Sequence, residues 1–432
     1  MIHDFQHAND PLQSRYRFLI PDSWAGGVTI IAAQWARELA ARAAQVQLVF
    51  QKDVSRGRFL EPDRQLFEGL PCTEIRFDSL DKATRIGRQV FSQLAIAPND
   101  LMLVNSSDSY AAKFLRYARC QGKSFKYIQV MVNDNAANYA NLKRSLSTCD
   151  LIVSISQQLH QKSMQLVRDE ENQIPTVQVP PGTVVGPRQE HSTMSDGLRI
   201  CYVGRVEAIQ KRVFDLVEMM AQICQTRRDV LLTIVGDGLA RKPLDAAFRN
   251  RGLANHVSFV GRQSHARVLQ ILKDQHVFVL PSEYEGFGVV LCEAMAAGLV
   301  PIATRVAGPQ DVIRDGNNGF LVDVGDVAKM AQRACELAVD ESQRRRMSER
   351  AWETAQREMS VANSIDQLTA ALNRVGKADF DDRRHGSARS RWLSLDAPLV
   401  PNLATRWARR LWRNRQSRIR FKAAQGGAAS SR

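Results

Sequence analysis

Short apolar runs alternate with longer amphipathic stretches along the first half of the chain. The runs at 15–20, 46–50, 101–105, 127–132, 151–155 and 176–179 predict β-strands, and residues 28–43 carry apolar side chains at helical spacing. A turn at Gly26 and Gly27 links the first strand to this helix. A strand, a glycine turn, a helix and a second strand form a βαβ unit, which implies a parallel sheet. The first half therefore predicts one doubly wound α/β domain.

The same pattern restarts after a segment without apolar periodicity. Residues 181–197 are rich in Pro, Gly, Ser and Thr, which predicts a linker. Strands are then predicted at 198–203, 231–235, 256–260, 276–280 and 300–304, with helices near 213–226 and 289–297 among them. The second half therefore predicts another α/β domain of the same class, and a chain of 432 residues is long enough for two hydrophobic cores.

Glycine-containing turns follow several of the predicted strands. They lie at 26–27, 204–205, 236–238 and 285–288. Two doubly wound domains in series leave a cleft between them, and such sheets bind ligands beyond the carboxyl ends of their strands. One glycine after a strand is usually only a turn, but four in the same phase indicate a binding site at the edge of the sheets.

A glutamate interrupts a run of small apolar residues in the predicted helix at 289–297. Glu293 lies in its second turn beside Cys292 and Ala294, and small neighbours indicate close packing against another backbone. A carboxylate in that setting needs hydrogen-bond donors. Two interpretations remain open: a buried ion pair with an arginine, or a carboxylate that binds the two hydroxyls of a ribose.

The turn that precedes this helix predicts a phosphate site. Gly286 and Gly288 allow the backbone to approach a ligand, and their amides lie at the positive end of the helix dipole. Glu285 would then lie beside whatever the phosphate carries. Arg205 and Lys211 follow the first strand of the second half, where they could bind phosphate or remain solvated surface cations.

Composition favours a protein of a reducing compartment. The 44% apolar and 24% charged residues are typical of soluble globular proteins. The seven cysteines are scattered, with neither a CxxC pair nor a Cys/His cluster, which argues against a disulfide framework or a zinc site. The N-terminus lacks the apolar core of a signal peptide, and no apolar run reaches the length of a membrane span. We therefore expect a cytoplasmic protein.

Most of the net charge of +14 belongs to the end of the chain. Residues 383–432 contain 13 Lys/Arg and one acidic residue, which gives +12. Leu403, Trp407 and Leu411 recur at the spacing of one helical face, and arginines such as Arg406 and Arg409 point away from it. This predicts a basic amphipathic helix that binds an anionic membrane surface through 399–422, unless the segment is a disordered, solvated tail.

Several motifs of the second half resemble those of family 4 (group 1) retaining glycosyltransferases. Two glutamates, Glu285 and Glu293, are separated by seven residues in YEGFGVVLCEAMAAGLVPIATRVAG. They follow YVGRVEAIQKR (202–212) and IVGDG (234–238) and precede DGNNGFLV (315–322), in the order and at the spacing of that family. The resemblance is strong from about 198 to 339 and moderate over the first 180 residues. It implies the GT-B fold, in which two Rossmann-like domains face each other across a cleft.

The resemblance also implies a role for each matching residue. Glu293 would hold the donor ribose, and Arg205 and Lys211 would bind the diphosphate. Glu285 would be a catalytic residue that contacts hydroxyls of the transferred sugar. The remaining donor-binding residues would be Gly26, Gly27, Gly286, Phe287 and Gly288.

One position departs from the family pattern. Many members carry a histidine at a strand end of the N-terminal domain, facing the sugar. Here the comparable stretch is YIQVMVNDNAANY (127–139), and no histidine occurs between His7 and His160. Asn133 and Asp134 occupy the corresponding place. An asparagine could hydrogen-bond a sugar hydroxyl and an aspartate could accept a proton, so both are candidate catalytic residues.

The family also implies how the chain is divided. Residues 1–190 would form an acceptor-binding domain and 198–346 a donor-binding domain, with helices at 347–376 packing back on the first. Trp352, Ile365 and Leu368 would be among their apolar anchors. Residues 377–432 would form the basic tail, which the resemblance does not cover.

The expected function is transfer of a sugar from a nucleotide-diphosphate sugar to an acceptor, with retention, by a hexosyltransferase-type enzyme. The basic tail favours a lipid-linked or membrane-assembled acceptor, as in cell-surface polysaccharide or glycolipid synthesis, at the inner face of the cell membrane. No DxD pair lies at a strand end, so we expect neither a metal nor a cofactor. No fold that reads nucleic acid is recognisable, so we expect no nucleic-acid partner. The alternatives are a nucleotide-sugar-binding protein without catalysis, a transferase for a small soluble acceptor and a hydrolase with paired carboxylates.

Overall fold

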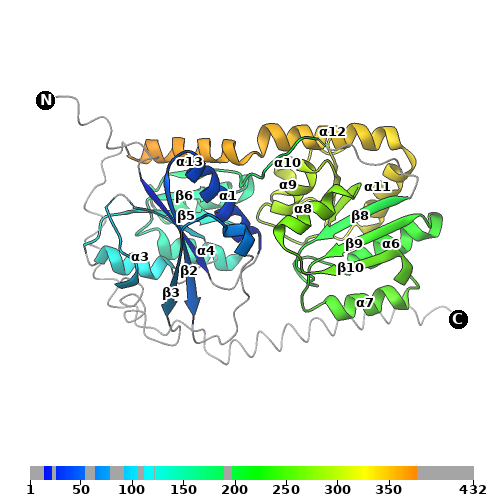
Figure 1. The fold of residues 1–432 in the computed structure, drawn as a ribbon, viewed down its shortest axis with the longest axis horizontal. Helices are drawn as coiled ribbons and strands as arrows, with labels where there is room; N and C mark the ends of the chain where they lie inside the picture. Colours follow the sequence, from blue (N-terminus) through cyan, green and yellow to red (C-terminus); the bar gives the residue numbers. More distant parts are fainter. Residues whose placement is uncertain are drawn as a thin grey trace.

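The computed structural model contains two α/β domains, each built on a parallel sheet (Figure 1). It describes residues 14–21, 26–53, 64–77, 92–98, 100–105, 111–120, 122–188 and 197–376. The two doubly wound domains confirm the expected fold class, whereas the predicted amphipathic tail lies outside the described residues. Within the described ranges, no helix combines the length and the apolar composition needed to cross a bilayer.

In the described residues of the N-terminal domain, seven parallel strands pair in the order β3-β2-β1-β4-β5-β6-β7. The strands are β1 (Arg15–Pro21), β2 (Gln45–Asp53), β3 (Cys72–Phe77), β4 (Asp100–Asn105), β5 (Lys126–Met131), β6 (Leu151–Ser154) and β7 (Thr176–Gln178), and the helices are α1 (Gly27–Ala41), α3 (Ala111–Cys120), α4 (Ala136–Ser145) and α5 (Gln157–Asp169). β4 and β6 are buried along their whole length, as expected for central strands covered by helices on both faces. The strand order reverses between β1 and β4.

The C-terminal domain has six strands in the order β10-β9-β8-β11-β12-β13. These are β8 (Leu198–Val203), β9 (Val230–Val235), β10 (Val257–Gly261), β11 (Val277–Leu280), β12 (Val300–Thr304) and β13 (Phe320–Val322), with α6 (Asp215–Thr226), α7 (Arg241–Asn250), α8 (His265–Lys273), α9 (Val289–Ala296), α10 (Pro309–Val312) and α11 (Val327–Val339). The order reverses between β8 and β11. The carboxyl ends of these two strands therefore flank the switch point at which open α/β sheets bind ligands.

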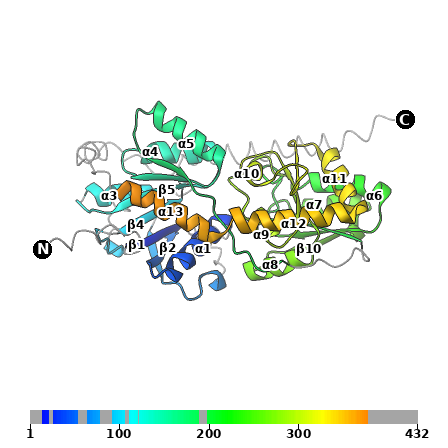
Figure 2. The ribbon, with the colours of Figure 1, turned by 90° about the horizontal axis from the view of Figure 1, so that it is seen from above.

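Two long helices at the end of the described chain span both domains. α12 (Glu341–Glu358) packs on α9 and α11, and α13 (Val361–Gly376) packs on α1, so that they lie in succession over the two domains (Figure 2). We expected residues 347–376 to pack as a whole on the N-terminal domain. The first helix differs because its side chains fit the C-terminal domain: Met347 and Ala351 are buried, and the Ser348 hydroxyl donates to the Gly298 carbonyl oxygen just after α9.

The expected anchors of these helices are buried to different degrees. Ile365 and Leu368 in α13 are fully buried. Trp352 in α12 is only half-buried, and its indole N–H donates to the Gly186 carbonyl oxygen at 3.1 Å. The anchoring on the N-terminal domain therefore comes from α13.

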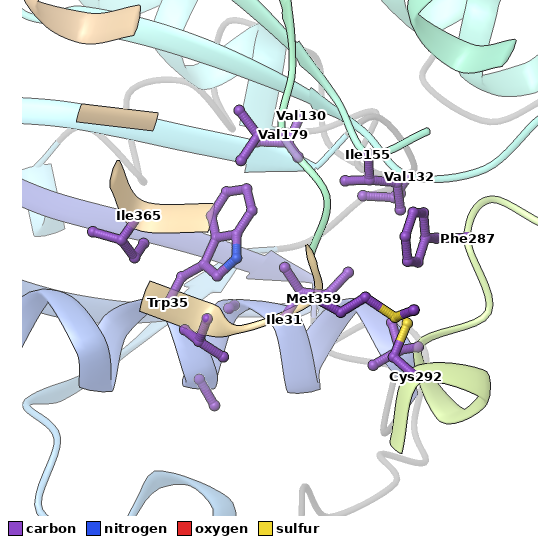
Figure 3. Close-up of a cluster of buried hydrophobic side chains, with 14 of the residues drawn as sticks. Ile31, Trp35, Val130, Val132, Ile155, Val179, Phe287, Cys292, Met359 and Ile365 are labelled. Carbon is purple, nitrogen blue, oxygen red and sulfur yellow. The ribbon is translucent and has the colours of Figure 1, made fainter. Parts of the chain in front are cut away.

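The two domains share one apolar cluster at their boundary. Phe287, in the loop after β11, faces Val132 and Ile155 of the N-terminal domain (Figure 3). Nearby, the backbone N–H of Gln157 at the start of α5 donates to the Asp311 carboxylate in α10 at 2.7 Å. The loop that carries Glu285 and Phe287 is thus positioned by both domains.

Candidate functional site

Two loops meet at the switch point of the C-terminal sheet. One follows β8 and carries Gln210, and the other follows β11 and begins at Pro281. The Glu283 amide donates to the Gln210 carbonyl oxygen at 2.8 Å, and the Gln210 side chain donates to the Tyr284 carbonyl oxygen at 3.3 Å. Backbone and side-chain hydrogen bonds therefore fix the two loops to each other.

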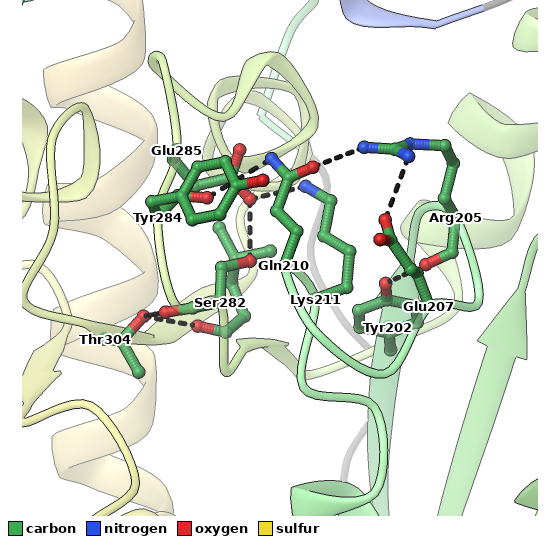
Figure 4. A network of polar contacts seen from close by, with 10 residues as sticks. Tyr202, Arg205, Glu207, Gln210, Lys211, Ser282, Tyr284, Glu285 and Thr304 are labelled. Carbon is green, nitrogen blue, oxygen red and sulfur yellow. Dashed lines mark hydrogen bonds and ion pairs between the residues drawn. The ribbon is translucent and has the colours of Figure 1, made fainter. Parts of the chain in front are cut away.

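Glu285 lies between these loops in a buried ion pair. Its Oε1 accepts from Lys211 Nζ at 2.5 Å and from Ser282 Oγ at 2.7 Å (Figure 4). The Glu285 side chain is 7% exposed and that of Lys211 14%. Thr304, at the end of β12, donates to the Ser282 carbonyl oxygen at 2.6 Å. Both of these hydrogen bonds are accepted by the same oxygen, and they hold the carboxylate in one orientation.

Arg205 lies on the β8 loop, near Lys211. Its Nη1 donates to Glu207 at 2.9 Å, and its Nη2 donates to the Gln210 side chain. The Tyr202 hydroxyl donates to the Arg205 carbonyl oxygen at 2.8 Å. Burial, with a contribution from the nearby Glu285 carboxylate, raises the pKa of the Tyr202 phenol well above its usual value, so this donor keeps its proton. The structure thus brings the two candidate phosphate-binding cations to the same loop.

Glu293 is buried in α9, as its small neighbours indicated. Its side chain is 1% exposed, and its Oε1 lies 2.8 Å from His265 Nε2 at the start of α8. The partner is therefore a histidine and not the arginine considered for the buried ion pair. In the part of the chain that the structure describes, no other group hydrogen-bonds the Glu293 carboxylate.

The glycine turn before α9 lies against the N-terminal domain. A Cβ added to Gly286 would be 1.8 Å from the Val132 carbonyl oxygen and 3.2 Å from Asn133 Cα. Gly288 has φ +81°, in the left-handed region that favours glycine, and directly precedes α9. Gly27 lies near Val289, the first residue of α9, because an added Cβ would be 3.3 Å from the Val289 side chain. A Cβ on Gly26 would meet nothing within 4 Å.

The two candidates after β5 differ in what their side chains contact. Asp134 accepts hydrogen bonds from the Tyr139 hydroxyl, Gln158 and Lys162, each at 2.8 Å. Burial and the Asp134 carboxylate raise the pKa of Tyr139, which keeps its hydroxyl protonated as a donor. The Asn133 side-chain amide makes no hydrogen bond to the described part of the chain. Asn133, which also lies beside Gly286, is therefore the better candidate for contacting a ligand.

Sequence reasoning missed several side chains of this site. Ser282, Gln210 and Thr304 orient the loops, and His265 contacts Glu293. Only Ser282 and Gln210 had a local signal in the sequence. Ser282 lies close to Glu285, and Gln210 directly precedes Lys211. Among the described residues, no group of three or more His, Cys, Asp or Glu side chains is arranged to hold a metal ion.

The C-terminal domain matches a known family model. Residues 188–354 match the model described as "Glycosyl transferases group 1". This segment contains Arg205, Lys211, Glu285 and Glu293, and it ends within α12.

Curated relatives are similar to part of the chain. The chain is 38% identical over 157 residues to N-acetyl-alpha-D-glucosaminyl L-malate synthase of Bacillus anthracis, covering 36% of this chain and 40% of that protein. It is 33% identical over 168 residues to the lipopolysaccharide core biosynthesis glycosyltransferase LpsE of Rhizobium meliloti, covering 39% and 47%. The matches thus span less than half the length of these relatives.

A solved structure extends the similarity to both domains. TarM of S. aureus, determined with Fondaparinux, alpha-GlcNAc-glycerol and UDP, superposes with a TM-score of 0.71 over 84% of this chain and all of that chain. At 10% sequence identity this similarity concerns the fold alone. The chain has the GT-B fold, and its residues 188–354 carry the sequence pattern of the group 1 glycosyl transferases.

Proposed function

We propose that this protein is a family 4 retaining glycosyltransferase that moves a hexosyl group from a nucleotide-diphosphate sugar to an acceptor. The observation that carries this proposal is the meeting of Arg205, Lys211 and Glu285 at the β8–β11 switch point, within the segment that matches the group 1 model. Two cations beside a buried carboxylate suit a ligand that joins a diphosphate to a polyol.

The donor extends from Glu293 toward the N-terminal domain. Glu293 binds the ribose, Arg205 and Lys211 bind the diphosphate, and Glu285 contacts hydroxyls of the sugar. The backbone amides of 286–288 and of Gly26 and Gly27 approach the phosphates and the sugar. Asn133 reaches the sugar from the opposite domain, at the position where many family members have a histidine.

Catalysis depends mainly on stabilising the leaving nucleotide. As the bond between the sugar and the diphosphate breaks, negative charge develops on the phosphate oxygens. Arg205, Lys211 and the N-terminus of α9 supply fixed positive charge at that place. Positive charge that a bound metal ion could otherwise supply is thus provided by the protein. We therefore propose that transfer is independent of divalent metals.

The names of similar proteins support this proposal. LpsE is named as a glycosyltransferase of lipopolysaccharide core synthesis, and the structure of TarM contains UDP. By analogy, the acceptor here belongs to a cell-surface polysaccharide or glycolipid. A small soluble acceptor remains the alternative, since the name of the Bacillus anthracis relative contains L-malate.

A donor panel tests the activity. UDP-, GDP- and ADP-linked hexoses are screened by thermal shift, since a cognate donor stabilises the fold by mass action. Release of the nucleoside diphosphate is then measured with and without candidate acceptors, and NMR of the product gives the anomeric configuration. We expect acceptor-stimulated release, a retained configuration and an unchanged rate in EDTA. Binding without release would favour a nucleotide-sugar-binding protein, and loss of rate in EDTA with recovery in manganese would contradict metal independence.

We also propose that the protein attaches to the cytoplasmic face of a membrane through residues 399–422. The support is the sequence pattern of Leu403, Trp407 and Leu411 with flanking arginines, which lies outside the described residues. The full-length chain should float with anionic liposomes at low salt, and a chain ending at Gly376, the last residue of α13, should not. Equal behaviour of the two chains would remove the main reason for expecting a lipid-linked acceptor.

A further inference from the structure

We propose that His265 is a positioning residue that orients Glu293 toward the ribose of the bound nucleotide and thereby determines selectivity for ribose over 2′-deoxyribose. This inference rests on the proposed function, because it concerns how the donor site recognises its nucleotide. His265 lies outside the motifs that the sequence singled out and belongs to a different helix from Glu293.

His265 contacts Glu293 across two packed helices. It is the first residue of α8, whose N-cap Ser264 accepts a hydrogen bond from the Arg267 amide. α8 packs on α9, and His265 Nε2 lies 2.8 Å from Glu293 Oε1. Since an ionised carboxylate can only accept, Nε2 carries the hydrogen and donates it.

The surroundings of Glu293 make this donor necessary. The adjacent Cys292 and Ala294 are fully buried and offer no strong side-chain donor. A carboxylate that is 1% exposed and unpaired would carry a large desolvation cost. The hydrogen bond from His265 offsets this cost and fixes one carboxylate oxygen. The other oxygen then has a defined direction for a ligand hydroxyl.

This arrangement predicts selectivity and not only affinity. A site built to accept a hydrogen bond from a ligand hydroxyl discriminates against an analogue that lacks it, because a buried acceptor is then left unpaired. Without His265 the carboxylate of Glu293 loses its fixed orientation, and the 2′-hydroxyl of the ligand contributes less to the binding affinity. The affinity for the ribonucleotide should fall more than the affinity for its 2′-deoxy analogue.

The test compares ribonucleotides with deoxyribonucleotides. Dissociation constants of UDP, GDP and ADP, and of their 2′-deoxy forms, are measured by calorimetry for the wild type and for His265→Ala, His265→Gln and Arg267→Ala. For the diphosphate that binds, we expect the wild type to prefer ribose about tenfold, from one hydrogen bond to a charged group. His265→Ala should bring this ratio close to one, and His265→Gln, which retains a donor, should keep part of it. Arg267→Ala, whose side chain is exposed on the same helix, should keep the wild-type ratio.

Each other outcome overturns a specific statement. If the wild type binds none of the three diphosphates, the proposed function fails, and the role of His265 fails with it. If the wild type binds but His265→Ala keeps the wild-type ratio, only the role of His265 fails. An equal loss of affinity for the ribose and deoxyribose forms, with a lowered melting temperature, would make His265 a purely structural residue.

Discussion

Replacing Glu285 by glutamine should lower the turnover of sugar transfer by about 100-fold or more, while the affinity for the nucleoside diphosphate stays the same or rises. The loss is of the size found when a preorganised group that acts on the transition state is removed. Glutamine has nearly the same volume and still offers an oxygen to Ser282. The change therefore removes the charge and leaves the shape of the loop.

The expected gain in affinity follows from Lys211. In the free protein the Lys211 ammonium is paired with Glu285 at 2.5 Å, so part of its charge is already neutralised when a diphosphate arrives. Without the carboxylate, the largely buried ammonium has lost its partner, and a bound phosphate would satisfy it. The free protein should be less stable for the same reason, and the diphosphate should restore more of that stability than in the wild type.

The measurement separates kcat from the dissociation constant of the diphosphate. The matched control is Glu283→Gln, two positions earlier in the same loop. Glu283 pairs with Arg212, and its side chain is 46% exposed, so this pair should contribute little. Unchanged turnover in Glu285→Gln, or an equal loss in both variants, would remove Glu285 from the reaction.

The sequence predicted the central strands because a local feature, a short apolar run, is enough to indicate a buried strand. β4 and β6 are buried along their length, and their sequences are almost continuous apolar runs. Two edge strands were missed because their local apolar signal is weak. β3 reads CTEIRF, with charged residues on one side, and β13 is only three residues long, so neither gives a strong apolar signal.

The members of the candidate site were recognisable, but their pairing was not. Glu285 and Lys211 were both identified, yet the ion pair joins positions 74 residues apart and depends on the packing of two loops. Glu293 was expected to be buried, but its partner is set by the contact of α8 with α9. Likewise, the packing of α12 on the C-terminal domain depends on which face of a long helix meets which neighbour. Local spacing carries no information on such contacts.

Replacing Gly286 by alanine should reduce transfer by about 100-fold while both domains remain folded. The added Cβ would lie 1.8 Å from the carbonyl oxygen of Val132 and 2.7 Å from its carbonyl carbon. These are backbone atoms of the opposite domain, so they cannot turn away as a side chain could. Either the loop after β11 moves or the domains separate, and both changes displace Glu285 relative to Asn133. A misplacement of about 1 Å is enough for such a loss.

The stability of the variant should distinguish this explanation from simple unfolding. The core cluster of the C-terminal domain around Tyr202 and Phe248 does not include the boundary, so that domain should still unfold cooperatively. The matched control is Gly186→Ala, because an added Cβ there meets nothing within 4 Å. Transfer and thermal unfolding are measured for the wild type, Gly286→Ala and Gly186→Ala. A Gly286→Ala variant with wild-type transfer would mean that the close contact with Val132 is not needed during the reaction, and that the domains work in a more open arrangement than the one seen here.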